Sequence, residues 1–277
     1  MLTFVVSSML AVGLSLTVRE IITPLRNGKL LTLSVLANFV VMPLTAIMLA
    51  RGLQLAQPLG VALIIIGAAA GAPFLPKLAG IAAGNLAFSV GLMVLLMVLT
   101  VGYMPVVMPL MLQGVSVDPT KIARSLVLLM LLPLFFGLAV RARAATLAGR
   151  AATLLNRVSS ASLALLMVLL VVTNVRNIVN LFGTRAIVAS VVFLLVGVAV
   201  GWLLGGSTRD MKSVLALGTA QRNIAAALVV AGQNFEDPTV VVMVAVVAIV
   251  GLVLLMPLAR QLGKSTEQPS AERLQTL

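Results

Sequence analysis

Two charged side chains stand inside stretches that are otherwise apolar. Lys77 lies in the sequence GAAAGAPFLPKLAGIAAG (67–84), and Arg222 lies in VLALGTAQRNIAAALVVAG (214–232). A charge at bilayer depth costs about 2.5 to 3.5 kcal/mol, so such a side chain usually faces a cavity or a partner. We expect these two cations to bind a carboxylate or sulfonate through charge-assisted hydrogen bonds. Polar neighbours of Arg222 complete the predicted substrate site, and they are Thr219, Gln221 and Asn223.

The acidic residues favour an anion as the ligand. All seven fall in predicted loops, at helix ends or in the tail: Glu20, Asp118, Asp210, Glu236, Asp237, Glu267 and Glu272. No carboxylate is therefore predicted at bilayer depth to neutralise Lys77 or Arg222, or to bind a cation. Each of these two cations also lies near the predicted positive end of a half-helix, which again favours an anion.

The composition defines the class of protein. Of the 277 residues, 61% are hydrophobic and 9% are charged, and the mean hydropathy is +1.19. A soluble domain of this size cannot bury so much apolar surface, so the chain is predicted to be a polytopic membrane protein. The sequence has no cysteine and no histidine, which excludes disulfides, thiolate or histidine metal sites and a histidine proton relay. No cofactor and no enzymatic activity are predicted.

The net charge of +12 is better explained by membrane topology than by nucleic-acid binding. The basic residues occur singly between apolar runs, and only 4% of the residues are aromatic. One set of alternate loops, with the tail, holds twelve of the basic residues, whereas the other set holds five. The positive-inside rule then predicts a multi-pass protein of the plasma (inner) membrane with its N-terminus outside and its C-terminus in the cytoplasm.

Apolar runs long enough to cross the ~30 Å hydrocarbon layer predict an all-α membrane protein with about nine transmembrane helices. These runs lie at 2–18, 29–50, 58–83, 85–112, 122–140, 158–178, 186–205, 212–232 and 238–259. The third run is broken by Gly71, Pro73 and Pro76, and the eighth is broken by the polar residues around Arg222. Paired broken helices are the best sequence indication of a transporter's binding site.

The order of the helices predicts two repeats of inverted topology. A plain helix, a second helix, a broken helix and a long helix follow one another in 2–112 and again in 158–259. The two blocks start five spans apart, so they run in opposite senses across the membrane. We therefore predict a first repeat at 1–113, a second repeat at 114–260 and a polar tail at 261–277.

The chain resembles the bile acid:sodium symporter superfamily. The resemblance is carried by LAVGLSLTVREI (10–21), LANFVVMP (36–43), GNLAFSVGL (84–92) and ALGTAQRNIAAAL (216–228). It implies a panel domain and a core domain, with two broken helices that cross in the core at the substrate and sodium sites. Family members typically have ten helices, and the first helix here is similar to the family's second, so the resemblance implies that the family's first helix is missing.

The resemblance implies three ion-binding positions and several departures from the family. Asn38 and Ser89 fall on ligands of the two sodium ions, and Gln221 matches the glutamine of the second broken helix. Where the family has a Ser-Asn pair, this chain has Leu75 and Pro76. The glutamate that the family has shortly before the glutamine is absent, since Ala216 and Leu217 stand in that region, and Met93 replaces a threonine. We therefore predict degraded sodium sites, with Lys77 and Arg222 in the place of the ions.

The predicted function is a secondary active transporter that moves a small organic anion by alternating access. Its partners would be that anion and the lipid bilayer, with no nucleic acid and sodium only as a possible coupling ion; the oligomeric state is not predicted. A sodium-independent or proton-coupled carrier, an exporter and a non-transporting membrane partner or receptor remain alternatives. At the residue level, Arg222 could instead cap carbonyls of the opposing broken helix, and Lys77 could reach the cytoplasmic interface.

Overall fold

The computed structural model of the chain is a helical bundle, and it describes residues 1–22, 27–112, 117–173, 175 and 184–275. The described residues contain no β-strand. The helices are α1 (Leu2–Ser15), α2 (Val18–Ile22), α3 (Gly28–Leu36), α4 (Met42–Gly52), α5 (Gln57–Ala68), α6 (Leu75–Ile81), α7 (Leu86–Met111), α8 (Pro119–Leu126), α9 (Leu132–Arg143), α10 (Ala145–Thr173), α12 (Ala186–Leu204), α13 (Arg209–Ala220), α14 (Ile224–Asn234) and α15 (Pro238–Gln275). Two π-helical turns, η2 (Ala37–Val41) and η3 (Val127–Leu131), join α3 to α4 and α8 to α9.

The predicted all-α membrane class is confirmed. Seven helical segments of the described chain are long and apolar enough to cross a bilayer, and α1 and α5 are shorter apolar helices. Together these nine segments correspond to the nine predicted spans. The predicted boundary between the repeats, at 113/114, lies outside the described residues, as does the end of the span predicted at 158–178.

Two predicted boundaries are wrong. The span predicted at 2–18 ends at Ser15, because Thr17 and Glu20 form a capping box that starts the separate helix α2. The segment 141–157 was expected to be a loop, but α10 already begins at Ala145. This segment is rich in alanine, leucine and arginine, which are good helix formers, so α10 extends well before its apolar part.

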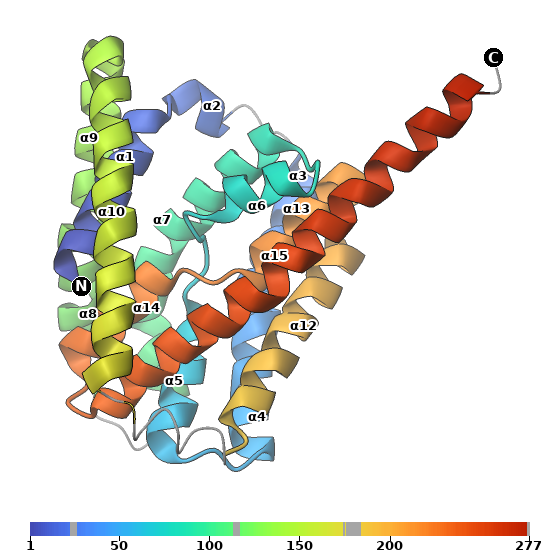
Figure 1. The fold of residues 1–277 in the computed structure, drawn as a ribbon. Helices are drawn as coiled ribbons and strands as arrows, with labels where there is room; N and C mark the ends of the chain where they lie inside the picture. The colour runs from blue at the N-terminus through green and yellow to red at the C-terminus, as the bar shows by residue number, and fades with distance from the viewer. Residues whose placement is uncertain (23–26, 113–116, 174, 176–183, 276–277) are drawn as a thin grey trace.

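Helices α1, α9 and α10 form a panel at one side of the bundle, on the left of Figure 1. Helix α1 packs closely on α9, since a Cβ atom at Gly13 would lie within 2.2 Å of the carbonyl oxygen of Leu134. Helix α8 continues into α9 through η3. The helices of residues 28–111 and 186–264 form the core of the bundle, where α13 packs on both α7 and α15. Within the core, Gly197, Gly201 and Gly205 let α12 approach the backbone of α13, which is the ordinary packing role of such spaced glycines.

Two helices of the core are interrupted at mid-length, as predicted. The first pair is α5 and α6, separated by residues 69–74, and the second is α13 and α14, separated by residues 221–223. In the first break Gly71 has φ +78°, and a Cβ atom there would lie 2.2 Å from the backbone nitrogen of Met97, so glycine is required. The two breaks touch, because the backbone N–H of Asn223 donates to the carbonyl oxygen of Ala69 at 2.9 Å.

Candidate functional site

Arg222 is 2% exposed, and its guanidinium lies at the crossing of the two breaks. Its Nε donates to Ile66 O at 3.1 Å, and Nη1 donates to Asn38 Oδ1 at 2.7 Å and to Thr219 O at 3.2 Å. Its Nη2 donates to Gly67 O at 2.6 Å and to Asn38 O at 3.4 Å. Arginine has five N–H groups, so every donor of this side chain is used on an uncharged oxygen of the protein.

Local chain geometry explains why these oxygens are available. Gly67 lies in the last turn of α5, where carbonyl groups have no partner within the helix. In the π-helical turn η2, the N–H of Met42 bonds to Ala37 O, five residues back. By the same register Asn38 O would need the N–H of residue 43, but that residue is proline and has none. Arg222 supplies the missing donor.

The first break is held by side chains from two other segments. Asn223 Nδ2 donates to Gly71 O at 3.0 Å, in addition to the backbone bond from Asn223 to Ala69. Thr100 on α7 satisfies both backbone groups of Ala70: its hydroxyl donates to Ala70 O and accepts from Ala70 N, each at 3.0 Å. The backbone of the break is therefore fixed without any charged group of its own.

A cavity of about 400 Å³ lies between the panel and the core beside the crossing. Its core side includes Gln221, Arg222 and the first break at Pro73 and Phe74, and its panel side includes α1 and α10. The side-chain Oε1 of Gln221 is buried and has no hydrogen-bond partner in the described structure. Arg222 is the one charged residue among the described residues that line this cavity. We call it the crossing cavity.

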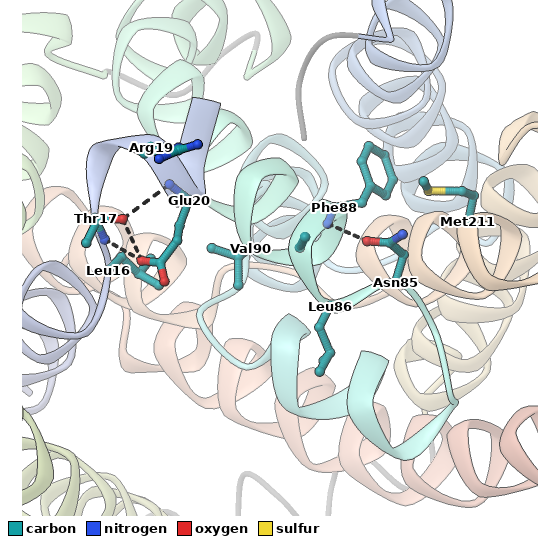
Figure 2. Close-up of a pocket in the computed structure, with 10 residues that line it drawn as sticks. Leu16, Thr17, Arg19, Glu20, Asn85, Leu86, Phe88, Val90 and Met211 are labelled. Carbon is teal, nitrogen blue, oxygen red and sulfur yellow. Dashed lines mark hydrogen bonds between the residues drawn. The ribbon is translucent and has the colours of Figure 1, made fainter. Parts of the chain in front are cut away.

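A second cavity, of about 740 Å³, lies at the end of α1 (Figure 2). Its walls come from the α1–α2 junction, from the start of α7 and from Met211 of α13. Figure 2 shows the capping box here, in which Glu20 accepts hydrogen bonds from the backbone N–H and the hydroxyl of Thr17. These bonds lower the pKa of Glu20. We call this the end cavity.

Both cavities border the segment that contains α1. Phe4, Ser8 and Val12 lie four apart on one stripe of α1 and line the crossing cavity. Leu16, directly after the end of α1, lines the end cavity. The panel–core interface therefore contains a hollow at mid-depth and a wider one toward the end where α2, α6 and the C-terminal part of α15 lie in Figure 1.

The structure brings together four of the predicted site residues and separates the others. Asn38, Thr219 and Arg222 belong to one network, since Asn38 Nδ2 also donates to Thr219 Oγ1 at 3.3 Å, and Asn223 lies next to Arg222 and bonds to the first break. The residue that reaches Asn38 is Arg222, whereas the neighbouring Gln221 lies at the cavity.

Lys77 and Ser89 lie outside this network. Lys77 is exposed on α6, and its Nζ lies 5.2 Å from the centre of the Phe74 ring. Ser89 is on α7 and donates to Leu86 O in its own helix at 2.7 Å. Lys77 and Arg222, which we predicted to act as a pair, therefore have different surroundings in the structure.

Several residues of the site were not predicted from the sequence. Thr100 and Tyr103 are single polar residues in a long apolar helix, and Tyr103 donates to Phe39 O at 2.7 Å. Ser8, Asn156 and Ser159 line the panel side of the crossing cavity. Thr100 could have been noticed as a single hydroxyl in an apolar run. Its role in fixing the first break is seen only once α7 packs against that break.

The comparisons with known proteins agree with this architecture. A sequence model of the sodium bile acid symporter family matches residues 2–181, which is more than half of the chain. No curated protein matches the chain. The family is one of membrane transporters, and the long apolar helices and the paired breaks fit that class. This chain belongs to the sodium bile acid symporter family.

Proposed function

We propose that the chain is a carrier that moves a small organic anion by alternating access and needs no sodium ion. The observation that carries this proposal is the buried guanidinium of Arg222, with its five N–H groups on uncharged oxygens. Five hydrogen bonds to uncharged acceptors favour the protonated guanidinium, which has donors and no acceptor. The crossing therefore keeps a net positive charge through the transport cycle.

This charge attracts the substrate without binding it directly. Because Arg222 has no N–H group left, the anion would be bound by the side-chain Nε2 of Gln221 and by the backbone N–H of Ala225. The N–H groups of Ile224 and Ala226 already bond to Arg222 O and Asn223 Oδ1. Ile224 and Ala225 line the crossing cavity at the N-terminal end of α14, the positive end of that helix dipole. The positive potential of Arg222 is strong there, since the surroundings are apolar and exclude water.

Two features support independence from sodium. The oxygens of Asn38, Ile66, Gly67 and Thr219 are of the kind that a sodium ion prefers, and they already bind the guanidinium. The region of the other predicted sodium site is apolar: Leu75 is fully buried, and its Cδ2 would lie 2.9 Å from a Cβ atom at Gly218. Leucine offers no ligand for a cation.

The two cavities suggest how the substrate passes. We infer that the crossing cavity holds the anion and that the end cavity is the cytoplasmic vestibule. This assignment follows from basic residues near the end cavity. Arg19 lines it, and Arg141 acts on Glu20 in its wall. Arg209 precedes Asp210, which accepts a hydrogen bond from Asn85 in its wall. Rocking of the panel against the core would expose the crossing cavity to each side in turn.

The test uses purified protein, first in detergent and then in proteoliposomes. Small carboxylates and sulfonates that bind should raise the melting temperature by mass action, and Arg222→Gln should abolish that shift. Uptake of the best binder should saturate, should show counter-flow, and should be unchanged when sodium is replaced by choline. Uptake that requires a sodium gradient would overturn sodium independence, and a protein that neither binds nor transports any anion would overturn the whole proposal.

A further inference from the structure

The crossing cavity has a second polar side that the network around Arg222 does not use. Ser8 of α1 and Asn156, Ser159 and Ser160 of α10 line it from the panel, facing the side formed by the breaks. The rest of the panel side is apolar, with Phe4, Val12, Leu163 and Met167. Polar groups placed singly in an apolar wall are what fixes the orientation of a bound small molecule.

The hydroxyl groups on this side are unpaired. Five serines elsewhere in the bundle donate to a carbonyl of their own helix: Ser7, Ser15, Ser34, Ser89 and Ser190. Ser159 is only 7% exposed, yet neither it nor Ser8 has a hydrogen bond to any described residue. These hydroxyls line the crossing cavity, so a ligand there can bond to groups that no described residue uses.

We propose that Ser159, with Ser8 and Asn156, binds a hydrogen-bonding group at the far end of the transported anion, so that the substrate carries a hydroxyl or amide as well as its acid. This inference rests on the proposed function. Serine and asparagine side chains both donate and accept, which suits a hydroxyl or an amide. No basic residue is found among the described residues of the panel side, so a second carboxylate does not fit. The substrate class is thus a monoanion with an apolar middle and a polar, uncharged end.

The test measures, by calorimetry on the purified protein, the dissociation constants of three series of acids. The series are unbranched carboxylates of four to six carbons, the same acids with a terminal hydroxyl, and the corresponding dicarboxylates. The unmodified protein should prefer the hydroxylated acid over its parent by about tenfold, as expected for one or two good hydrogen bonds. The dicarboxylates should bind more weakly than both.

Variants then assign that preference to the panel. Ser159→Ala should reduce the preference, which is the ratio of the two affinities, by about threefold or more. Ser159→Thr should restore it, because the hydroxyl is kept. Ser190→Ala is the matched control, since Ser190 is also buried but bonds to Ala186 O, and it should leave the preference as it is.

The outcomes separate this inference from the function on which it rests. If carboxylates bind but the hydroxyl gives no advantage, the second polar side has no ligand role and the carrier proposal stands. A hydroxyl preference that survives Ser159→Ala, Ser8→Ala and Asn156→Ala together would also overturn the assignment. If no acid of any series binds, both proposals fail.

Discussion

The two breaks at the crossing interrupt their helices at similar places, but they differ in the polar and charged side chains that they carry. The first spans residues 69–74 and holds no charged side chain, so its backbone groups depend on Thr100 and Asn223 from other segments. The second spans residues 221–223 and carries both the arginine and the asparagine that fasten the crossing. One break accepts hydrogen bonds and the other supplies them, so a change in the second should affect both.

The same contrast separates the two cations. Arg222 is buried and its donors are all used, whereas Lys77 is exposed beside the Phe74 ring. Phe74 itself lines the crossing cavity. Lys77 therefore acts at most on the wall of the cavity and on approaching anions, while Arg222 holds the crossing together.

The largest effect is expected from Arg222→Ala. Five bonds to buried oxygens are lost, at about 1 kcal/mol each, and the positive charge goes with them. We expect no measurable anion uptake and a clear fall in the melting temperature. Arg222→Lys keeps the charge but has three donors instead of five. Its uptake rate and melting temperature should lie between those of the unmodified protein and those of Arg222→Ala. Wild-type uptake in Arg222→Ala would mean that the guanidinium has no role in transport.

The next effect concerns the first break. Thr100→Val keeps the shape of the side chain but leaves the N–H and C=O of Ala70 unpaired, which should lower the free energy of unfolding by about 2 kcal/mol. Thr45→Val is the control, because Thr45 only bonds to Val41 O in its own helix. Equal destabilisation by the two variants, measured by thermal unfolding in detergent, would argue against a special role for Thr100.

A smaller effect is expected from Lys77→Met. The change keeps a long side chain against Phe74 but removes the ammonium group above the ring. A cation–π interaction at an exposed site contributes about 0.5 kcal/mol to stability. Stability should stay within error, and the Michaelis constant for the anion should rise modestly with little change in maximal rate. If Lys77→Met abolished transport as fully as Arg222→Ala, the distinction between the two cations would be wrong.

The smallest effect is a pH dependence at the end cavity. The pKa of Glu20 is lowered in the folded protein by the hydroxyl and the N–H of Thr17, so its contribution to stability is present above the ordinary value of 4.5 and is lost as the pH falls through the lowered value. Glu20→Gln should therefore melt slightly lower than the unmodified protein at pH 7, and the difference should vanish in strong acid. A difference that grows on acidification would contradict this sign.

The helices of the bundle and their breaks could be predicted because they depend on local sequence. Long apolar runs form spanning helices, and glycine, proline or a charged residue within a run interrupts the helix. The run lengths gave nine spans, and Gly71, Pro73 and Arg222 marked the interruptions. The start of α10 was missed because its first half is helical without being apolar. The inverted repeat and the orientation in the membrane stay predictions.

The site was only partly predictable, because its contacts join residues far apart in the chain. The sequence identified Asn38, Thr219, Arg222 and Asn223 as polar residues in apolar runs, but it gave Lys77 the same weight as Arg222. Burial, and not residue type, separates these two cations. The partners of Arg222 are mostly backbone carbonyls, which no residue pattern reveals.

The most direct test of the account is the thermal stability of Arg222→Ala in the presence of small cations. If the guanidinium fills a cage of oxygens from Asn38, Ile66, Gly67 and Thr219, the emptied cage should accept a substitute. Methylguanidinium at millimolar concentration, and to a lesser degree sodium, should raise the melting temperature of Arg222→Ala and leave the unmodified protein unchanged. An Arg222→Ala protein that no cation stabilises relative to choline would contradict the claim.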